Sequence, residues 1–437
     1  MKLEAREKWA TKPSPRGNSL YCCVAAGPRT CRQKHRAERE RTVNRKAYAG
    51  ILGLVSVALG FLMSCSSNSS SSPPPPISHT TRYLVVSDYY NNRVLIYDSP
   101  FSTGESASVV LGQSQFTTSA TGTTADSMFF PIGTSEDSDS NLYVNDTANS
   151  RVLQFKPPFA NGMAASLAIG QPDFTSGFPN DGTPNASQNG LNFAWGSAFD
   201  SSGNLWVADT GNHRILEFKP PFATGMNASL VLGQANFTSN MPAGPPSTAT
   251  TSSGLDGPDM LAFDPSGNLW VTDAGNSRVL EFVPPFANGM AASLVIGQPD
   301  FVSNGPATTV SGLADPVGIA FDGAGDLWIE GGNRVLEFKP PFANGMNASL
   351  VLGQASFTTD TAATTQNGMS VPFGIASDSS GNLYVADYVN DRTLQFAPPF
   401  SNDQNANLVF GQADFTTSGV ATTATGQNRP IAVTAAF

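Results

Sequence analysis

The chain has 437 residues, of which 24 are Lys or Arg and 34 are Asp or Glu, so its formal net charge at pH 7 is −10. The charge is divided unevenly, because residues 1–65 carry a net charge of +9 and residues 66–437 one of −19. Binding to nucleic-acid phosphates needs clustered Lys and Arg, so the acidic part of the chain excludes nucleic acid as its expected partner.

The N-terminal segment has the layout of an export signal. An apolar run, Ala47–Met63, follows basic residues that include Arg45, as the apolar region of a secretory signal does. One hypothesis is that translation starts at Val43. The mixed leader of residues 1–42 would then be untranslated, and residues 43–64 would form an ordinary signal peptide.

A lipid attachment site is predicted at the end of this signal. Leu62-Met63-Ser64-Cys65 resembles a bacterial lipobox, in which the Cys becomes the lipidated N-terminus. Residues 65–81 are rich in Ser and then in Pro, which is typical of a tether that is flexible and then stiff. The alternative is an uncleaved membrane anchor, because about 17 apolar residues approach the lower limit for spanning a bilayer. We favour an exported lipoprotein of the bacterial outer membrane or one that faces the periplasm.

Six copies of one sequence unit fill residues 82–437. The pair Gly-Gln recurs with steps of 58, 63, 64, 56 and 58 residues, at Gly112, Gly170, Gly233, Gly297, Gly353 and Gly411. A fixed period in this range indicates a repeat architecture.

Each unit is predicted to form four short β-strands. In the third unit the apolar runs are Trp195–Phe199, Leu205–Ala208, Arg214–Phe218 and Ser229–Leu232, separated by Gly, Pro, Asn and Asp, as strands are. The runs are apolar at consecutive positions, whereas a sheet that is wet on one face would alternate. The sheets therefore need cover on both faces, which a ring of blades provides. The predicted fold class is all-β: a six-bladed β-propeller of four-stranded antiparallel blades.

The two ends of the repeat predict how the ring closes. The first unit begins near Tyr83 with a run that matches a second strand, and the chain ends at Arg429–Phe437 with a run that matches a first strand. We therefore expect the C-terminal strand to pair with the N-terminal strand in one blade, which removes an exposed sheet edge.

The repeat resembles a known family. The phrase from Gly203 to Ile215 is similar, almost residue for residue, to the core pattern of the NHL repeat, and weaker copies lie at 141–152, 268–279 and 382–394. The resemblance covers residues 82–437 and implies a six-bladed platform fold. Members of the family bind proteins or nucleic acid, and related propellers include lactonases and lyases, so the fold alone does not choose a function.

Asp and Arg recur in one turn of the units, as Asp88/Arg93, Asp146/Arg151, Asp209/Arg214, Asp273/Arg278 and Asp387/Arg392, with Arg334 in the fifth unit. A catalytic group is needed once rather than in every unit, so we interpret these residues as structural. We expect Asp to cap the turn and Arg to lock the hairpin or the next blade. The Pro-Pro-Phe segment of each unit is expected to end the third strand and to pack its Phe on one rim.

Residues that depart from the repeat are the candidates for a ligand site. The loops that enter the first strands should ring one mouth of the channel, where Trp195 and Asp259 put an aromatic and a carboxylate on neighbouring blades. Glu136 stands where three other units have Phe, and Glu330 replaces the repeat Asp in a turn shortened by one residue. Such carboxylates can hold Ca²⁺ with backbone oxygens, or they can bind a sugar that stacks on Trp195. The alternative is that these residues changed by sequence drift in an unconstrained repeat and bind nothing.

Two functions follow from these observations. We favour a non-catalytic binding or scaffold module, monomeric and without a cofactor, whose partner is a protein or a carbohydrate. The alternative is a metal-assisted lactonase or lyase that uses Ca²⁺ at Asp259, Glu136 and Glu330. A three-His zinc site is excluded, because only His79 and His213 follow Cys65. His213 stands where the family pattern itself has His, so we interpret it as structural.

Overall fold

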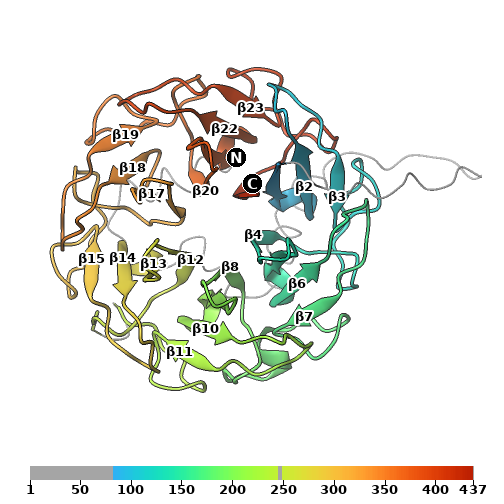
Figure 1. Cartoon of the computed structure of the whole chain (residues 1–437), viewed down its shortest axis with the longest axis vertical. Coiled ribbons are helices and arrows are strands. Elements are labelled where there is room, and N and C mark those ends of the chain that lie inside the picture. Colours follow the sequence, from blue (N-terminus) through green and yellow to red (C-terminus); the bar gives the residue numbers. More distant parts are fainter. Residues whose placement is uncertain (1–81, 245–248, 437) are drawn as a thin grey trace, which may run out of the picture. The chain divides into compact units, whose positions relative to one another are not determined.

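Six four-stranded antiparallel sheets make up the described part of the chain (Figure 1). The structure is a computed structural model, and it describes residues 82–244 and 249–436. The expected leader, signal peptide, lipidated Cys65 and tether lie outside the described residues. No helix among the described residues has the length and the apolar character that crossing a membrane requires.

The first three blades follow the predicted units. Blade 1 contains β1 (Tyr83–Asp88), β2 (Arg93–Asp98), β3 (Val109–Leu111) and, from the C-terminus, β24 (Pro430–Ala436). Blade 2 contains β4 (Pro131–Glu136), β5 (Leu142–Asp146), β6 (Arg151–Phe155) and β7 (Leu167–Ile169). Blade 3 contains β8 (Ala194–Phe199), β9 (Leu205–Asp209), β10 (Arg214–Phe218) and β11 (Leu230–Leu232).

The other three blades repeat the same order. Blade 4 contains β12 (Pro258–Phe263), β13 (Leu269–Asp273), β14 (Arg278–Phe282) and β15 (Leu294–Ile296). Blade 5 contains β16 (Ile319–Phe321), β17 (Leu327–Glu330), β18 (Val335–Phe338) and β19 (Leu350–Leu352). Blade 6 contains β20 (Pro372–Ser377), β21 (Leu383–Asp387), β22 (Arg392–Phe396) and β23 (Leu408–Phe410).

The predicted closure is confirmed. β24 pairs antiparallel with β1, with Tyr83 opposite Ala436 and Asp88 opposite Pro430. The red C-terminal strand therefore lies beside the blue strands of blade 1 in Figure 1. The C-terminal strand takes the place of the first strand that the first unit lacks.

Short 3₁₀ turns join the second and third strands in five blades: η1 (Tyr89–Asn91), η2 (Thr147–Asn149), η4 (Thr210–Asn212), η5 (Ala274–Asn276) and η6 (Tyr388–Asn390). A further one, η3 (Pro179–Gly182), lies in the loop between β7 and β8. Pro131 is paired with Asp146, so these turns lie at the end where the chain enters each innermost strand. We call this end the entry face and the opposite end the exit face.

The core consists of layers between neighbouring blades. Leu205 and Val207 of β9 pack in the layer shared with blade 2, whereas Trp206 and Ala208 pack in the layer shared with blade 4. Both faces of the strand are thus buried, which explains why its apolar residues are consecutive. Burial of this kind on both sides of every sheet is the main favourable contribution to folding.

The innermost strands touch one another near the entry face. A Cβ on Gly196 of β8 would lie 2.6 Å from the carbonyl oxygen of Asp259 in β12, and one on Gly318 would overlap the carbonyl oxygen of Phe373 in β20. Glycine is therefore required where these strands approach each other. Beside them lies a cluster of buried apolar residues from five blades, formed by Ile132, Trp195, Val317, Val371, Phe373 and Ile431.

Candidate functional site

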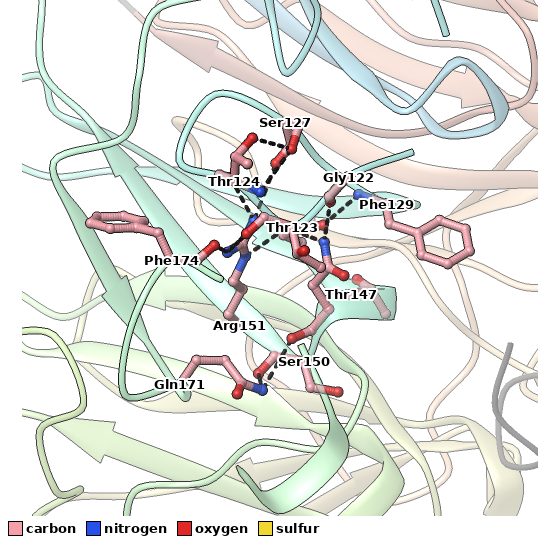
Figure 2. Close-up of polar contacts among 12 residues, drawn as sticks. Gly122, Thr123, Thr124, Ser127, Phe129, Thr147, Ser150, Arg151, Gln171 and Phe174 are labelled. Atoms are coloured by element: carbon pink, nitrogen blue, oxygen red, sulfur yellow. Dashed lines mark hydrogen bonds and ion pairs between the residues drawn. The ribbon is translucent and has the colours of Figure 1, made fainter. Parts of the chain in front are cut away.

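A buried arginine holds the loops of each blade together. Arg151 Nε donates to Asp146 Oδ2 at 2.7 Å, and both side chains are fully buried. Its terminal nitrogens donate to the carbonyl oxygens of Thr124 and Ser127, which precede the blade, and of Phe174, which follows it (Figure 2). One guanidinium thus fixes the incoming loop, the turn and the outgoing loop.

The same pair recurs in four other blades, with Nε to Oδ2 distances of 2.6–2.7 Å in Arg93–Asp88, Arg214–Asp209, Arg278–Asp273 and Arg392–Asp387. The phenylalanines after Gly-Gln accept from these arginines through their carbonyl oxygens, at Phe116, Phe237, Phe301 and Phe415. In these blades the Arg and Asp side chains therefore bind other groups of the protein itself and stabilise the fold.

The role of the repeat aspartate differs from the expected turn cap. Asp146 Oδ1 accepts the backbone N–H of Phe129 in the incoming loop at 2.7 Å, while Oδ2 also accepts from the side chain of Asn149. The turn itself is closed by its backbone, because Ser150 is left-handed and its N–H donates to the carbonyl of Thr147. The prediction that Asp caps the turn was therefore wrong, because Asp146 binds the incoming loop and makes no side-chain cap of the turn.

The residue after each turn joins its blade to the next one. His213 Nδ1 accepts the backbone N–H of Gly257 at 3.0 Å and lies 3.2 Å from Asp256 Oδ1. Asn92 and Ser150 accept equivalent N–H groups from the following entry loops through their side-chain oxygens. His213 therefore occupies a structural position of the repeat.

The Pro-Pro-Phe segments seal the edges of the blades. Asn161, two residues after Phe159, accepts the N–H of Val110 in the outermost strand of blade 1, and Gly162 donates to the carbonyl of the same Val110. The Phe159 ring packs on Tyr83 with ring centroids 5.9 Å apart. The segment thus does more than end a strand, because it provides hydrogen-bond partners for the backbone at the free edge of the preceding blade.

Two of the four candidate site residues are brought together. Trp195 and Asp259 are the second residues of the neighbouring innermost strands β8 and β12, where Gly196 contacts the backbone of Asp259. Both are at most 5 % exposed. The Nε1 donor of Trp195 is buried without a hydrogen-bond acceptor among the described residues.

Glu136 lies at the opposite face, and Glu330 lies near the entry face in blade 5. Glu136 ends β4 at the exit face and accepts from the Tyr83 hydroxyl at 2.7 Å. A rise of about 3.3 Å per residue puts it roughly 13 Å along the strand from Ile132, the β4 residue equivalent to Trp195. Glu330 is buried in β17 near the entry face, where it accepts the N–H of Val317.

The register of Glu330 differs from the sequence prediction. Glu330 pairs with Val335 rather than with Arg334, so it occupies the position of Thr272 in blade 4 and not that of the repeat Asp273. The turn is two residues shorter than in blade 4, and Gly331 stands in the position of Asp273. Arg334 Nε consequently donates to the carbonyl of Gly331 at 3.4 Å.

Within residues 82–244 and 249–436, no three side chains of His, Cys, Asp or Glu gather in a way that could hold a metal ion. Ca²⁺ at Asp259, Glu136 and Glu330 stays a prediction from the sequence.

An aromatic cluster occupies one sector of the entry face, and sequence reasoning missed it. Tyr89 of η1 stacks on Phe130 with ring centroids 4.6 Å apart, and Tyr90 meets the same ring edge-on at 5.6 Å. Tyr388 of η6 approaches Tyr89 at 6.4 Å, and the Arg429 guanidinium lies 5.3 Å from the centre of the Tyr388 ring. We call these five residues the aromatic sector.

The aromatic sector is partly exposed and electrostatically perturbed. Burial and the neighbouring tyrosines raise the pKa of Tyr388 above its ordinary value. Burial also raises the pKa of Asp391 to about 6, against the opposing effect of the Arg429 N–H and guanidinium. The sequence signal was present, because η1 and η6 begin with Tyr where η2, η4 and η5 begin with Thr or Ala.

Comparisons with known proteins agree with this architecture. A family model for the NHL repeat matches residues 191–218, and no curated protein matches the chain. A protein of unknown function from Bacteroides caccae is 10 % identical, with a TM-score of 0.47, over 82 % of this chain and 99 % of its own.

Two enzymes are among the similar solved structures. A catalytically inactive virginiamycin B lyase from Staphylococcus aureus is 11 % identical over 76 % of this chain and 85 % of its own, with a TM-score of 0.39. A gluconolactonase from Xanthomonas campestris is 14 % identical over 75 % and 84 %, also with a TM-score of 0.39. These similarities are too remote to indicate an activity. The chain is a six-bladed β-propeller that carries an NHL repeat.

Proposed function

We propose that the protein is a non-catalytic binding or scaffold module whose partner docks on the entry face, at the aromatic sector. The observation that supports this proposal is the aromatic sector itself, which breaks the sixfold repetition at blades 6 and 1, where the turns begin with Tyr. Tyrosine and phenylalanine supply large contact areas at small entropic cost, and tyrosine keeps a polar end for solvent or a partner.

The contacts of the repeat motifs support the same proposal. The guanidinium of Arg151 and the carboxylate of Asp146 are fully buried and make their hydrogen bonds to the turn and to the adjoining loops. Such groups stabilise a rigid ring, and a rigid surface binds a partner with little loss of conformational entropy. The ring is thus a platform, and its irregular aromatic residues are the contact points.

The envelope location is part of the proposal and has its support in the sequence. The lipobox-like Leu62-Met63-Ser64-Cys65 and the tether of residues 65–81 would hold the propeller at the bacterial outer membrane or facing the periplasm. A lipid anchor with a flexible linker keeps a binding face close to the envelope while leaving it free to reorient.

Site-specific photo-crosslinking tests the proposal. A benzoylphenylalanine at Tyr90 of the full chain would be irradiated in cells that produce the protein, and the adducts would be identified by mass spectrometry. The control is the same amino acid at Val283, an exposed residue that precedes a Pro-Pro-Phe segment at the exit face. We expect one dominant protein or glycan adduct at position 90 only. The absence of an adduct there, or equal adducts at both positions, would refute the proposal.

The lactonase or lyase alternative stays a prediction and has its own test. Glu136 lies at the exit face and Asp259 at the entry face, so the two cannot share one ion without a rearrangement of the strands. We therefore expect Ca²⁺ to leave the melting temperature unchanged. A rise with added Ca²⁺ that Asp259→Ala abolishes would favour the alternative.

A further inference from the structure

A cavity lies on the exit face between blades 5 and 6, with a volume of about 640 Å³. Its walls come from the turn that begins at Asp322, from β18 and β19, and from Pro398–Phe400 of the next blade. This volume is in the range of small-molecule sites. The cavity is on the opposite face from the aromatic sector.

Paired charges line this cavity. Lys339 Nζ donates to Asp326 Oδ2 at 2.6 Å and to Glu337 Oε1 at 3.1 Å, and Ser349 Oγ donates to the other oxygen of Glu337. Asp326 and Glu337 are 9 % and 3 % exposed, whereas the Lys339 side chain is about half exposed. The cavity thus presents a donor and two acceptors within ordinary hydrogen-bond spacing of each other.

Asp326 departs from the repeat. The equivalent residues of four other blades are amides that donate to the aspartate four residues earlier, at Asn141, Asn204, Asn268 and Asn382. A carboxylate cannot make that bond, and Asp326 binds Lys339 instead. In blade 3, Lys219 is 3.5 Å from Glu217, but an amide, Asn204, stands in the position of Asp326. The arrangement of Lys339 between Asp326 and Glu337, which we call the charged triad, is therefore a special feature of blade 5.

An apolar surface adjoins the triad. Phe400 lines the cavity beside Leu350 and packs edge-on against Trp328, with ring centroids 4.8 Å apart. Trp328 is held in turn by a hydrogen bond from Nε1 to Asp322. An aromatic ring in a fixed orientation next to paired donors and acceptors is suited to a ligand with one apolar face and polar edges.

We propose that this cavity is a binding site for a neutral saccharide unit. Neighbouring hydroxyls of a sugar can each donate to Asp326 or Glu337 and accept from Lys339, and the C–H face of the ring can rest on Phe400. The lining has three carboxylates, Asp322, Asp326 and Glu337, against the one ammonium group of Lys339. This excess of negative charge disfavours an anionic ligand, whereas the hydroxyl groups of a neutral saccharide can donate to the carboxylate oxygens. The site is separate from the aromatic sector, so either proposal can fail without the other.

Calorimetric titration and saturation-transfer NMR with maltotriose, cellotriose and triacetylchitotriose, each on the full chain, test the inference. The variants are Asp326→Asn, which restores the amide of the other blades and should fold, and Lys339→Met, which keeps the apolar stem. Matched controls are Asn268→Asp, which makes the reciprocal change in blade 4, and Tyr90→Ala in the aromatic sector. Circular dichroism would verify that each variant folds.

We expect at least one of the three saccharides to bind, with affinity reduced at least tenfold in Asp326→Asn and Lys339→Met and unchanged in both controls. The inference is overturned if no saccharide binds, if both variants bind as the wild type does, or if a cation such as spermidine binds in their place. Loss of saccharide binding in Tyr90→Ala alone would assign the sugar to the entry face and would also overturn it.

Discussion

At the scale of single residues, the charged Arg and Asp side chains of the repeat serve to stabilise the fold. Arg214 and Asp209 are both fully buried and paired at 2.7 Å, and a buried ion pair tolerates the loss of one member poorly. Arg334 is an internal contrast, because its Nε donates to a backbone carbonyl rather than to a carboxylate. The repeat therefore contains its own comparison between a paired arginine and an unpaired one.

We predict that Arg214→Met lowers the free energy of unfolding by about 3–5 kcal/mol, because Asp209 is left as an uncompensated buried charge. Arg334→Met should cost roughly 1–3 kcal/mol, the loss of hydrogen bonds to carbonyl oxygens. Urea unfolding followed by tryptophan fluorescence measures both. Equal losses in the two variants would contradict the structural role of the ion pair.

A second prediction concerns pH. Asp391 is buried at the ring closure, with a pKa of about 6 in the folded protein, above the ordinary value of about 3.9. The folded state thus binds the Asp391 proton more tightly than the unfolded state, so the contribution of Asp391 to stability is fully present below about pH 4 and is lost as the pH rises through 6. Asp391→Asn keeps the acceptor for the Arg429 N–H and removes the charge, as Asn92 does in blade 1.

The variant Asp391→Asn should match the wild type near pH 4 and exceed its stability at pH 7 by roughly 1–3 kcal/mol. Thermal melts between pH 4 and pH 8 measure the difference. A variant that is less stable than the wild type at pH 7 would show that the contact of Asp391 with Arg429 outweighs the burial of the charge.

At the scale of elements, two kinds of contact hold the blades in the ring. The innermost strands approach each other closely, and the outermost strands receive hydrogen bonds from the following unit. Gly318 lets β16 approach β20, because a Cβ there would overlap the carbonyl oxygen of Phe373. At the rim, side chains such as Asn161 occupy the free edge of the preceding blade. Each blade is thus held at its innermost strand by the neighbouring blade and at its outermost strand by the following Pro-Pro-Phe segment.

Gly318→Ala is predicted to lower the free energy of unfolding by about 1–3 kcal/mol, since the added methyl group over-packs the contact with β20. The control is Gly323→Ala in an exit-face turn, where a Cβ would meet nothing within 4 Å. That change should be neutral or slightly stabilising. Chemical denaturation compares them, and an undiminished stability of Gly318→Ala would refute the close approach of the strands.

Much of the fold could be predicted from the sequence, because strand runs and turn signals recur with a fixed period. The roles of particular side chains could not. Asp146 binds an N–H that lies 17 residues earlier, which no local pattern reveals. Glu330 shifts its register because its turn is two residues shorter than the turn of blade 4, and the effect on Arg334 follows only from the pairing.

At the scale of the whole molecule, the candidate binding site depends on closure. The aromatic sector combines Tyr388 near the C-terminus with Tyr89 near the start of the described chain, about 300 residues apart in sequence, a separation at which local patterns predict no contact. Arg429, which precedes β24, lies over Tyr388. The sector was therefore hidden from sequence reasoning, although Tyr89 and Tyr388 were visible as departures from the repeat.

Deletion of residues 429–437 tests this account most directly. Without β24, β1 loses its partner, blade 1 has three strands and the contact between blades 6 and 1 opens. We predict that the shortened chain melts at least about 10 °C below the full chain and that its benzoylphenylalanine at Tyr90 loses the specific adduct. An unchanged melting temperature together with an unchanged adduct would contradict both the closed ring and the binding face that closure creates.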